Sequence, residues 1–493
     1  MPSTDLRLIT AVRGAFGNFD AYLKESLSNV YEEHPLDGEM QTYIDSLESL
    51  DDNEFAIFKR VDEIKEKWQL LIEKSVKCLR YYDGREPFLA NPAKKPQAYG
   101  IEDLRSYYDK YTEFESMLYG GSRYYRDHVI HSFRVWLLGI HILLENNCAY
   151  LKKVIIARGY ESNPLEKLSV WTIVSLTHDL GYPLEKALHV IEKTRDMMKS
   201  FVANPIVSMD LAFNGVQNSM NDYVLRFVSS KMRECDGSIE NDVEEEGLEY
   251  VARLQPKYYF KFQKSLEHNE HGILSALIIF KLLIYFLESD YSVNEDYRFS
   301  KEDSRQFYIR REILRAVASH TCHDIYQLNM FNFSFLLIIC DDAQEWGRKS
   351  LSELYVNKGE TYKFEALEVL FETPPFTCKL KDKYEVEKVA SIEKILDSFE
   401  RQSKSYRKIF RDGQDTNSRN FHFIRQIEID VTKSTAKNYM LKLFVSSNEQ
   451  TKIVATKTDN ENMSEKEDFY KSFKKIFGKA TLSEDSKELS VIL

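Results

Sequence analysis

Apolar positions recur along most of this chain with the spacing of an α-helix. Between Asn53 and Tyr82 they lie three and four residues apart, as at Trp68, Leu71 and Ile72, which is the spacing that buries one face of a helix. Six later segments are also apolar and helical in pattern: Tyr124–Glu145, Leu165–Thr177, Leu184–Phe201, Ile273–Leu287, Arg311–Ser319 and Asn332–Trp346. We therefore predict a mostly α protein with a bundle of apolar helices in its middle region.

After about residue 355 the apolar spacing changes from that of a helix to that of a strand. Phe421–Thr432 and Tyr439–Ser446 alternate between apolar and polar side chains, which is typical of half-buried strands. The other elements expected here are a turn at Ser434–Asn438, a strand at Leu489–Leu493, and helices at Val386–Phe410 and Glu465–Phe477. The pattern predicts a small C-terminal α+β domain, similar to a ferredoxin-like or ACT-like module.

The changes in pattern predict three parts of the chain, since 493 residues exceed one typical core. The parts are a helical N-terminal extension (1–99), a central helical domain (100–352) and the α+β domain (353–493). Three prolines in Pro87–Gln97 mark the first boundary. Residues 202–262 are predicted to be an insertion in the central domain, and its acidic part Cys235–Gly247 is expected to be exposed.

Composition narrows the functional classes. The net charge of −11 argues against extensive coating of nucleic acid. None of the six cysteines forms a CxxC pair, and Cys148, Cys322 and Cys340 lie in apolar context, so reduced thiols in a cytoplasmic protein are expected. We identify no signal-peptide pattern, and the longest apolar run, Ile273–Leu287, contains Lys281 and is too short for a membrane span.

Histidine and aspartate residues lie at the ends of the apolar helices or within them. The set is His131, His178, Asp179, His271, His320 and Asp341. A buried aspartate is costly unless it is paired or bound to a cation, and imidazole and carboxylate groups are ligands for divalent metals. His178 and Asp179 are adjacent, and Gly181 and Pro183 end the helix there, so the backbone can turn and direct both side chains to one ion.

The order His … His-Asp … His … His … Asp resembles the HD-domain superfamily of metal-dependent phosphohydrolases, over about residues 125–350. The resemblance implies a first metal site of His131, His178, Asp179 and Asp341. It implies that His271 and His320 bind a second metal, that Asp179 bridges the two ions, and that a bridging water is the nucleophile. The expected cofactor is one or two divalent ions (Mn, Fe, Co, Ni or Mg), with histidine ligands favouring the transition metals.

The chain departs from two named HD subfamilies. Leu-Gly-Tyr-Pro-Leu-Glu-Lys follows the His178–Asp179 pair, where dNTP triphosphohydrolases have Gly-His-Gly-Pro-Phe-Ser-His. The Gly181-Tyr182-Pro183 sequence also lies in a different place from the Gly-Tyr-Pro of cyclic-di-GMP phosphodiesterases. The substrate of either subfamily therefore cannot be transferred to this chain.

Further polar residues are candidates for contacts with substrate. Lys186 is a second catalytic candidate beside Asp179, because a phosphate group needs cationic partners near the metal. The substrate-binding candidates are Arg126, His128, Arg134 and His323. For each of them a solvated surface position, or for the histidines a role in supporting a metal ligand, is the alternative interpretation. Asp342 could exchange roles with Asp341.

The predicted function is hydrolysis of a phosphoanhydride or phosphodiester bond in a nucleotide or nucleotide second messenger. The alternatives are an oligonucleotide phosphodiesterase or nuclease, a catalytically silent nucleotide-binding signalling protein, and di-iron oxygenation. We expect a nucleotide-type small molecule as the main partner and no membrane. Nucleic acid is a less favoured partner, and a homo-oligomer is left open.

Overall fold

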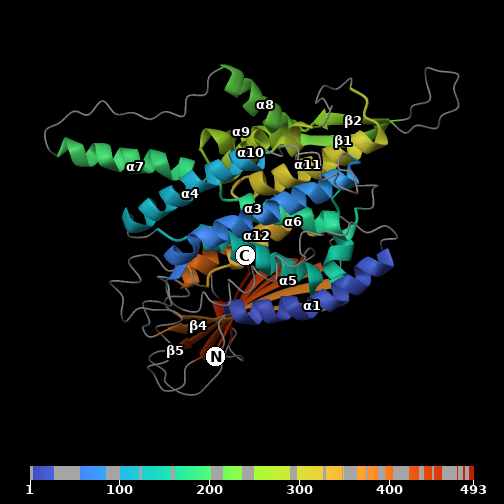
Figure 1. Ribbon diagram of the computed structural model, residues 1–493. Helices are drawn as coiled ribbons and strands as arrows, with labels where there is room; N and C mark the ends of the chain where they lie inside the picture. Colours follow the sequence, from blue (N-terminus) through green and yellow to red (C-terminus); the bar gives the residue numbers. More distant parts are fainter. Residues whose placement is uncertain are drawn as a thin grey trace.

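The computed structural model describes the helical region and the central parts of the C-terminal strands (Figure 1). The described residues are 4–26, 56–84, 100–121, 125–156, 162–200, 215–235, 249–288, 297–325, 329–346, 348, 363–372, 376–386, 395–403, 421–431, 438–446, 449–457, 475, 481–482 and 488–492. The proline-rich segment Pro87–Gln97, residues 236–248, residues 432–437 and nearly all of the expected helix Glu465–Phe477 lie outside them.

The protein is mostly α-helical, as the apolar spacing predicts. The first helices are α1 (Thr4–Ser26), α3 (Ala56–Tyr82), α4 (Ile101–Gly121), α5 (Val129–Lys153), α6 (Pro164–Thr177) and α7 (Tyr182–Lys199). The later ones are α8 (Gly215–Ser229), α9 (Pro256–Glu267), α10 (His271–Leu282), the 3₁₀ helix η1 (Ile284–Leu287), α11 (Lys301–Ser319) and α12 (Phe333–Ala343). None of these helices is both long and apolar enough to cross a membrane.

Helix α6 lies at the centre of the helical body (Figure 1). All 14 of its residues are buried, and it packs against α3, α5, α11 and α12. A helix that is apolar on every side has to be surrounded by protein. Its start is fixed by a capping box between Asn163 and Glu166, with Pro164 in the first turn.

The contact between α5 and α6 depends on a glycine. A Cβ atom at Gly139 of α5 would lie 1.9 Å from the ring of Trp171 in α6. The Trp171 Nε1–H donates a hydrogen bond to the carbonyl oxygen of Trp136, one turn earlier in α5, at 3.0 Å. The indole therefore occupies the space that a larger residue at position 139 would need.

Most predicted helix bounds are close to the observed ones, but three differ substantially. The helix predicted at Val386–Phe410 is described over residues 395–403, and Val386 belongs to a strand instead. Helix α11 begins at Lys301, ten residues before the predicted Arg311, because Ser300 caps its first turn through the Asp303 N–H at 3.1 Å. Helix α5 continues to Lys153, but Asn146, Asn147 and Cys148 within it have positive φ angles of 50°, 56° and 60°. The predicted end at Glu145 therefore coincides with a break in helical geometry.

The region predicted as an insertion contains regular structure. Strands β1 (Ser230–Cys235) and β2 (Glu249–Leu254) pair in antiparallel fashion. They lie between α8 and α9, and β2 packs against α8 and α11. The acidic residues 236–248 that join the two strands lie outside the described residues.

The C-terminal part forms one seven-stranded sheet in the order β3-β4-β5-β6-β7-β9-β8. Its strands are β3 (Lys363–Glu372), β4 (Phe376–Val386), β5 (Phe421–Val431), β6 (Asn438–Ser446), β7 (Glu449–Lys457), β8 (Thr481–Leu482) and β9 (Glu488–Ile492). Strands β4 and β5 are parallel and the other pairs antiparallel. The sheet is larger than the small module predicted, because strands β3, β4 and β7 were not predicted from the sequence, although the apolar residues of β4 alternate.

The sheet and the N-terminal helices are joined to the central bundle by one continuous apolar core. Its members include Ile9 of α1 and Trp68 of α3 at one end and Leu380 and Ile427 of the sheet at the other. The sheet lies beside α1 and α5 (Figure 1), and β3 contacts both helices. In the described residues, the N-terminal part thus packs directly on the bundle.

Candidate metal centre

The turn after α6 carries His178 and Asp179, and a serine of α10 holds it in place. The Ser275 hydroxyl donates to the His178 carbonyl oxygen at 2.6 Å and accepts from the Gly181 N–H at 2.7 Å. A Cβ atom at Gly181 would lie 2.4 Å from the His271 carbonyl oxygen. A glycine at this position therefore lets the turn pack closely against the start of α10.

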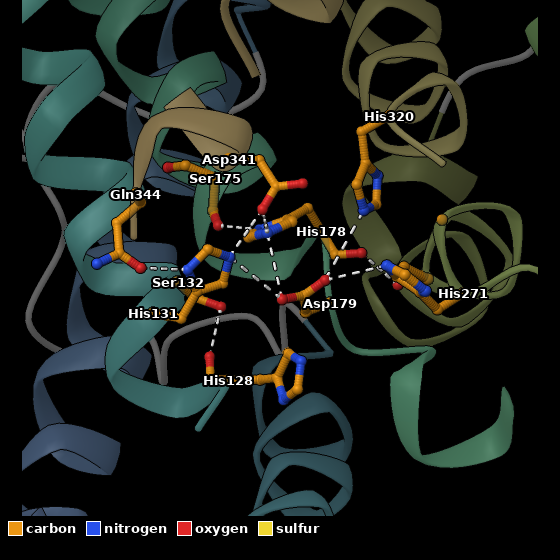
Figure 2. A network of polar contacts seen from close by, with 12 residues as sticks. His128, His131, Ser132, Ser175, His178, Asp179, His271, His320, Asp341 and Gln344 are labelled. Atoms are coloured by element: carbon orange, nitrogen blue, oxygen red, sulfur yellow. Dashed lines mark hydrogen bonds and ion pairs between the residues drawn. The ribbon is translucent and has the colours of Figure 1, made fainter. Parts of the chain in front are cut away.

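All six predicted metal ligands meet at this turn (Figure 2). His131 comes from the first turn of α5, His271 is the first residue of α10, His320 follows α11, and Asp341 lies near the end of α12. Distant segments of the chain thus contribute side chains to one buried cluster.

The first group of ligand atoms surrounds one oxygen of Asp341 and one of Asp179. The His131 Nε2 atom is 2.8 Å from Asp341 Oδ1 and 3.7 Å from Asp179 Oδ2. The His178 Nε2 atom is 3.8 Å from Asp341 Oδ1 and 3.3 Å from Asp179 Oδ2. The ligand atoms of His131, His178 and Asp341 all lie within 4.8 Å of one another, as a shared ion requires.

The second group surrounds the other oxygen of Asp179. The His271 Nε2 atom lies 3.3 Å from Asp179 Oδ1, and the His320 Nε2 atom lies 3.7 Å from it. The rings of His271 and His320 have centroids 5.0 Å apart. Asp179 therefore directs one carboxylate oxygen to each group of histidines (Figure 2).

Each of the four histidines is held through its Nδ1 atom, so that Nε2 faces the cluster. The Nδ1 atoms of His178 and His320 donate to the carbonyl oxygens of Ser175 and Val317, at 2.7 and 2.6 Å. His131 Nδ1 lies 2.5 Å from Gln344 Oε1, and His271 Nδ1 lies 2.7 Å from Glu185 Oε2. Metal-binding histidines are oriented by such partners on the ring nitrogen that does not face the ion.

Two of the inward-facing nitrogens are unsatisfied. His178 Nε2 and His320 Nε2 are buried and have no hydrogen-bond partner among the described residues. Buried polar atoms normally have a partner, and leaving one without it costs about 1–3 kcal/mol. Cations bound on the two sides of the Asp179 carboxylate would satisfy both nitrogens, so the residues present fit a divalent metal.

The pKa shifts of the aspartates and of two histidines in the cluster agree with metal binding. Burial alone would raise the pKa of Asp179, but the neighbouring imidazoles, His178 foremost, bring it well below its ordinary value. The pKa of Asp341 is likewise well below its ordinary value, since burial would raise it but the hydrogen bonds and charges of His131 and His178 together outweigh burial. Burial lowers the pKa of His131 and of His320, which favours neutral imidazole.

His271 differs because it lies between two carboxylates. Burial lowers its pKa, but hydrogen bonds to Asp179 and Glu185 outweigh that effect and raise the pKa to about 9. Without a cation, His271 is therefore protonated at neutral pH. A metal ion binding at its Nε2 atom must displace that proton.

Asp341 and Asp342, at the end of α12, have different surroundings. The Asp341 carboxylate is the one beside His131 and His178. The carbonyl oxygen of Asp342 accepts hydrogen bonds from Gln402 and Arg425 of the C-terminal part, at 3.0 and 3.2 Å. The helix thus presents one carboxylate to the cluster and one carbonyl oxygen to the C-terminal domain.

The predicted substrate-binding residues do not all lie at the cluster. The Arg134 guanidinium is buried and bound by Asp5 of α1, with Nη2–Oδ2 at 2.7 Å. The His323 side chain is 81 % exposed and lies 3.6 Å from Glu270. Arg126 donates to Glu345 Oε2 at 2.7 Å and to the Arg348 carbonyl oxygen at 3.0 Å. These contacts explain the three residues structurally, and none places them on a substrate.

His128 and Lys186 lie closer to the cluster. His128 is buried, its Nδ1 atom is 3.3 Å from Glu115 Oε2, and its ring packs on Tyr182 with centroids 3.9 Å apart. Lys186 Nζ binds Glu185 Oε1 at 2.6 Å and lies 4.7 Å from the centre of the Tyr182 ring. Lys186 therefore contacts the carboxylate that orients His271.

Three residues of the centre were not predicted as parts of it. Gln344 and Glu185 orient histidines, and they follow Asp341 and Asp179 by three and six residues. Arg348 carries a buried Nε atom without a hydrogen-bond partner in the described part of the chain. After burial, its positive charge is the largest influence that lowers the pKa of His131. The three-residue spacing from Glu345 to Arg348 gives no indication of this position.

Comparisons with protein-family models, with curated proteins and with solved structures found no match.

Proposed function

We propose that this protein is a metal-dependent phosphohydrolase of the HD-domain type, acting on a nucleotide or nucleotide second messenger. One observation supports it above the others: Asp179 directs Oδ2 to His131 and His178 and Oδ1 to His271 and His320. A carboxylate shared between two groups of imidazoles is the arrangement that a pair of divalent ions needs.

The residues divide between two candidate ion positions. His131, His178, Asp341 and Asp179 Oδ2 would hold one ion, and His271, His320 and Asp179 Oδ1 would hold the other. Four imidazoles and two carboxylates suit Mn²⁺, Fe²⁺, Co²⁺ or Ni²⁺ better than Mg²⁺, which prefers oxygen ligands. A bound ion of this class polarises a phosphoryl oxygen and lowers the pKa of a water molecule.

Side chains beside the candidate ligands could contact a substrate. Arg348 is the cation we propose for the substrate phosphate, because its charge acts on His131 and its Nε atom is unsatisfied among the described residues. His128 lies beside the cluster with Glu115 3.3 Å from its Nδ1 atom, and burial lowers the pKa of His128 well below its ordinary value, which favours a neutral imidazole. The net charge of −11 favours a small nucleotide over a long nucleic acid.

Hydrolysis of a panel of nucleotides and cyclic nucleotides with Mn²⁺, Fe²⁺, Co²⁺, Ni²⁺ and Mg²⁺ tests this proposal. We expect a phosphorus product with at least one transition metal, and a loss of at least about 100-fold in Asp179→Asn, which removes the shared negative charge. Asp324→Asn is the matched control, since Asp324 is a partly exposed carboxylate bound to Lys264.

Two results would contradict the proposal. Nucleotide binding without product for every metal would indicate a signalling protein instead of an enzyme. Equal activity of the wild-type and Asp179→Asn proteins would assign the reaction to another site or to a contaminant. Product formed without oxygen would separate hydrolysis from di-iron oxygenation.

A further inference from the structure

The short segment that follows Asp341 connects the candidate metal centre to the rest of the molecule. Gln344 accepts from His131 Nδ1 and donates through Nε2 to the Trp346 carbonyl oxygen at 2.6 Å. The Trp346 indole N–H donates to Asp5 Oδ1 of α1 at 2.7 Å. A displacement of this segment would therefore move one metal ligand and the residue that orients another.

The C-terminal domain holds this segment from the other side. Gln402 Nε2 and Arg425 Nη1 both donate to the carbonyl oxygen of Asp342, at 3.0 and 3.2 Å. Asp342 directly follows the candidate ligand Asp341, and α12 ends at Ala343. The last carbonyl groups of a helix have no partner within the helix, so these two donors fix the point where α12 ends.

The arginine is itself fixed by a buried partner. Arg425 Nη2 lies 2.8 Å from Asp382 Oδ2, and the side chains are 1 % and 0 % exposed. Such a pair is expensive to bury, and Arg425 directs its other terminal nitrogen, Nη1, to the Asp342 carbonyl oxygen. Here the guanidinium joins strands β4 and β5 to the end of α12, which is a connection that an apolar pair of the same size would not make.

The contact between the two domains also encloses a small cavity. Glu345, Tyr384, Phe399 and Gln402 are among the residues that line it. Glu345 belongs to the segment after Asp341, and the other three belong to the C-terminal domain. Because this contact is not packed solid, its two sides can shift relative to one another at a lower cost than in a filled core.

We propose that the C-terminal domain sets the metal affinity of the group formed by His131, His178 and Asp341, with Arg425 and Gln402 as positioning residues. The inference rests on the proposed function, since it concerns the same centre. A conformational change in the C-terminal domain would move the Asp342 carbonyl group and, with it, the neighbouring Asp341 carboxylate, and would thereby change the metal affinity. By reciprocity, metal binding must stabilise the contact between the domains.

The full-length protein tests this by titration with Mn²⁺ in a calorimeter. We expect the wild-type protein to bind two ions, and Gln402→Ala to bind one of them about 10-fold more weakly, the lower limit for loss of a residue that orients a metal ligand. The other ion, beside His271 and His320, should bind unchanged. Activity lost by the variant at low Mn²⁺ should return at saturating Mn²⁺, which a general loss of structure would not allow.

Two further variants sharpen the test. Arg401→Ala, on the same helical segment 395–403 as Gln402 but exposed, should bind Mn²⁺ as the wild-type protein does. Arg425→Met should weaken the same ion as Gln402→Ala, and circular dichroism checks its fold.

Unchanged Mn²⁺ affinity in a folded Gln402→Ala protein would overturn this inference and leave the proposed function intact. Equal weakening of both ions would also overturn it. A wild-type protein that binds none of Mn²⁺, Fe²⁺, Co²⁺, Ni²⁺ and Mg²⁺ would refute the proposed function and, with it, the inference.

Discussion

At the scale of single residues, Asp179 is the central side chain of the candidate metal centre, because each of its two carboxylate oxygens faces a different pair of histidines. The sequence places Asp179 next to His178 and at the end of an apolar helix, so both could be predicted as ligands. It does not say which oxygen meets which histidine, since that depends on the positions of α5, α10 and α11. The unsatisfied Nε2 atoms of His178 and His320 are likewise visible only in the fold.

Another histidine gives a prediction about stability and pH. His141 of α5 lies outside the cluster, is buried, and is 3.5 Å from Glu145 at its Nδ1 atom. Burial lowers its pKa from 6.5 to about 4. In the unfolded chain it is protonated below about pH 6.5, whereas in the folded protein it stays neutral until about pH 4. Its contribution is therefore fully present above pH 6.5 and is lost as the pH falls toward 4.

We expect this residue to remove about 2 kcal/mol from the free energy of unfolding between pH 7 and pH 5. His141→Leu should lack that loss, so its urea midpoint should fall less over this range than that of the wild-type protein. Both proteins are measured in EDTA, so that metal release does not contribute. An identical fall in the two proteins would show that His141 titrates normally in the folded state.

At the scale of elements, the central position of α6 is favoured by its sequence, because apolar residues such as Leu168, Trp171 and Ile173 lie on different sides of the helix. The distance between α5 and α6 does not follow in the same way. It is set by Gly139, whose missing side chain leaves room for the Trp171 ring. A glycine in a helical pattern is otherwise a residue that weakens the helix.

Two glycine substitutions separate the effect of close helix packing from that of helix propensity. Gly139→Ala should lower the free energy of unfolding by about 1–3 kcal/mol, because its Cβ would overlap the Trp171 ring. Gly14→Ala, in α1, meets nothing within 4 Å and should raise that free energy by about 0.5–1 kcal/mol through helix propensity. Urea unfolding measures both changes, and a stabilised Gly139→Ala protein would contradict the close contact.

At the scale of the whole molecule, the candidate ligands connect the turn after α6 to α5, α10, α11 and α12. A cation bound by them joins segments up to 210 residues apart in sequence, as for His131 and Asp341. Such a cation binds the folded chain and has no formed site in the unfolded one. It should therefore stabilise the folded protein by about 2.7 kcal/mol at a concentration 100 times its dissociation constant.

Thermal unfolding in EDTA and in Mn²⁺ measures this effect. We expect the midpoint temperature to rise by several degrees on addition of Mn²⁺ to the metal-free protein. His178→Ala should be folded in EDTA and should show a much smaller rise, since its imidazole belongs to the first group of ligands. A rise of equal size in both proteins would place the stabilising ion elsewhere.

The sequence by itself determined the mostly helical class and the apolar helices, because helical spacing is a property of local sequence. The six histidine and aspartate positions were predicted from their order along the chain, which resembles that of the HD-domain superfamily. The sequence also indicated β5, β6 and β9, whose apolar residues alternate. It did not determine the seven-stranded sheet, since the parallel pairing of β4 with β5 joins strands that are separated along the chain by the residues between Val386 and Phe421.

Tertiary structure alone decided which polar residues serve the centre. Arg134 and Arg348 are both arginines near candidate ligands in the sequence, yet one is bound by Asp5 and the other acts on His131. The same holds for Asp342, whose carbonyl oxygen meets the C-terminal domain. Local sequence fixes the direction of a side chain around its own helix, whereas its partners depend on how separate helices pack, and that packing is a property of the whole chain.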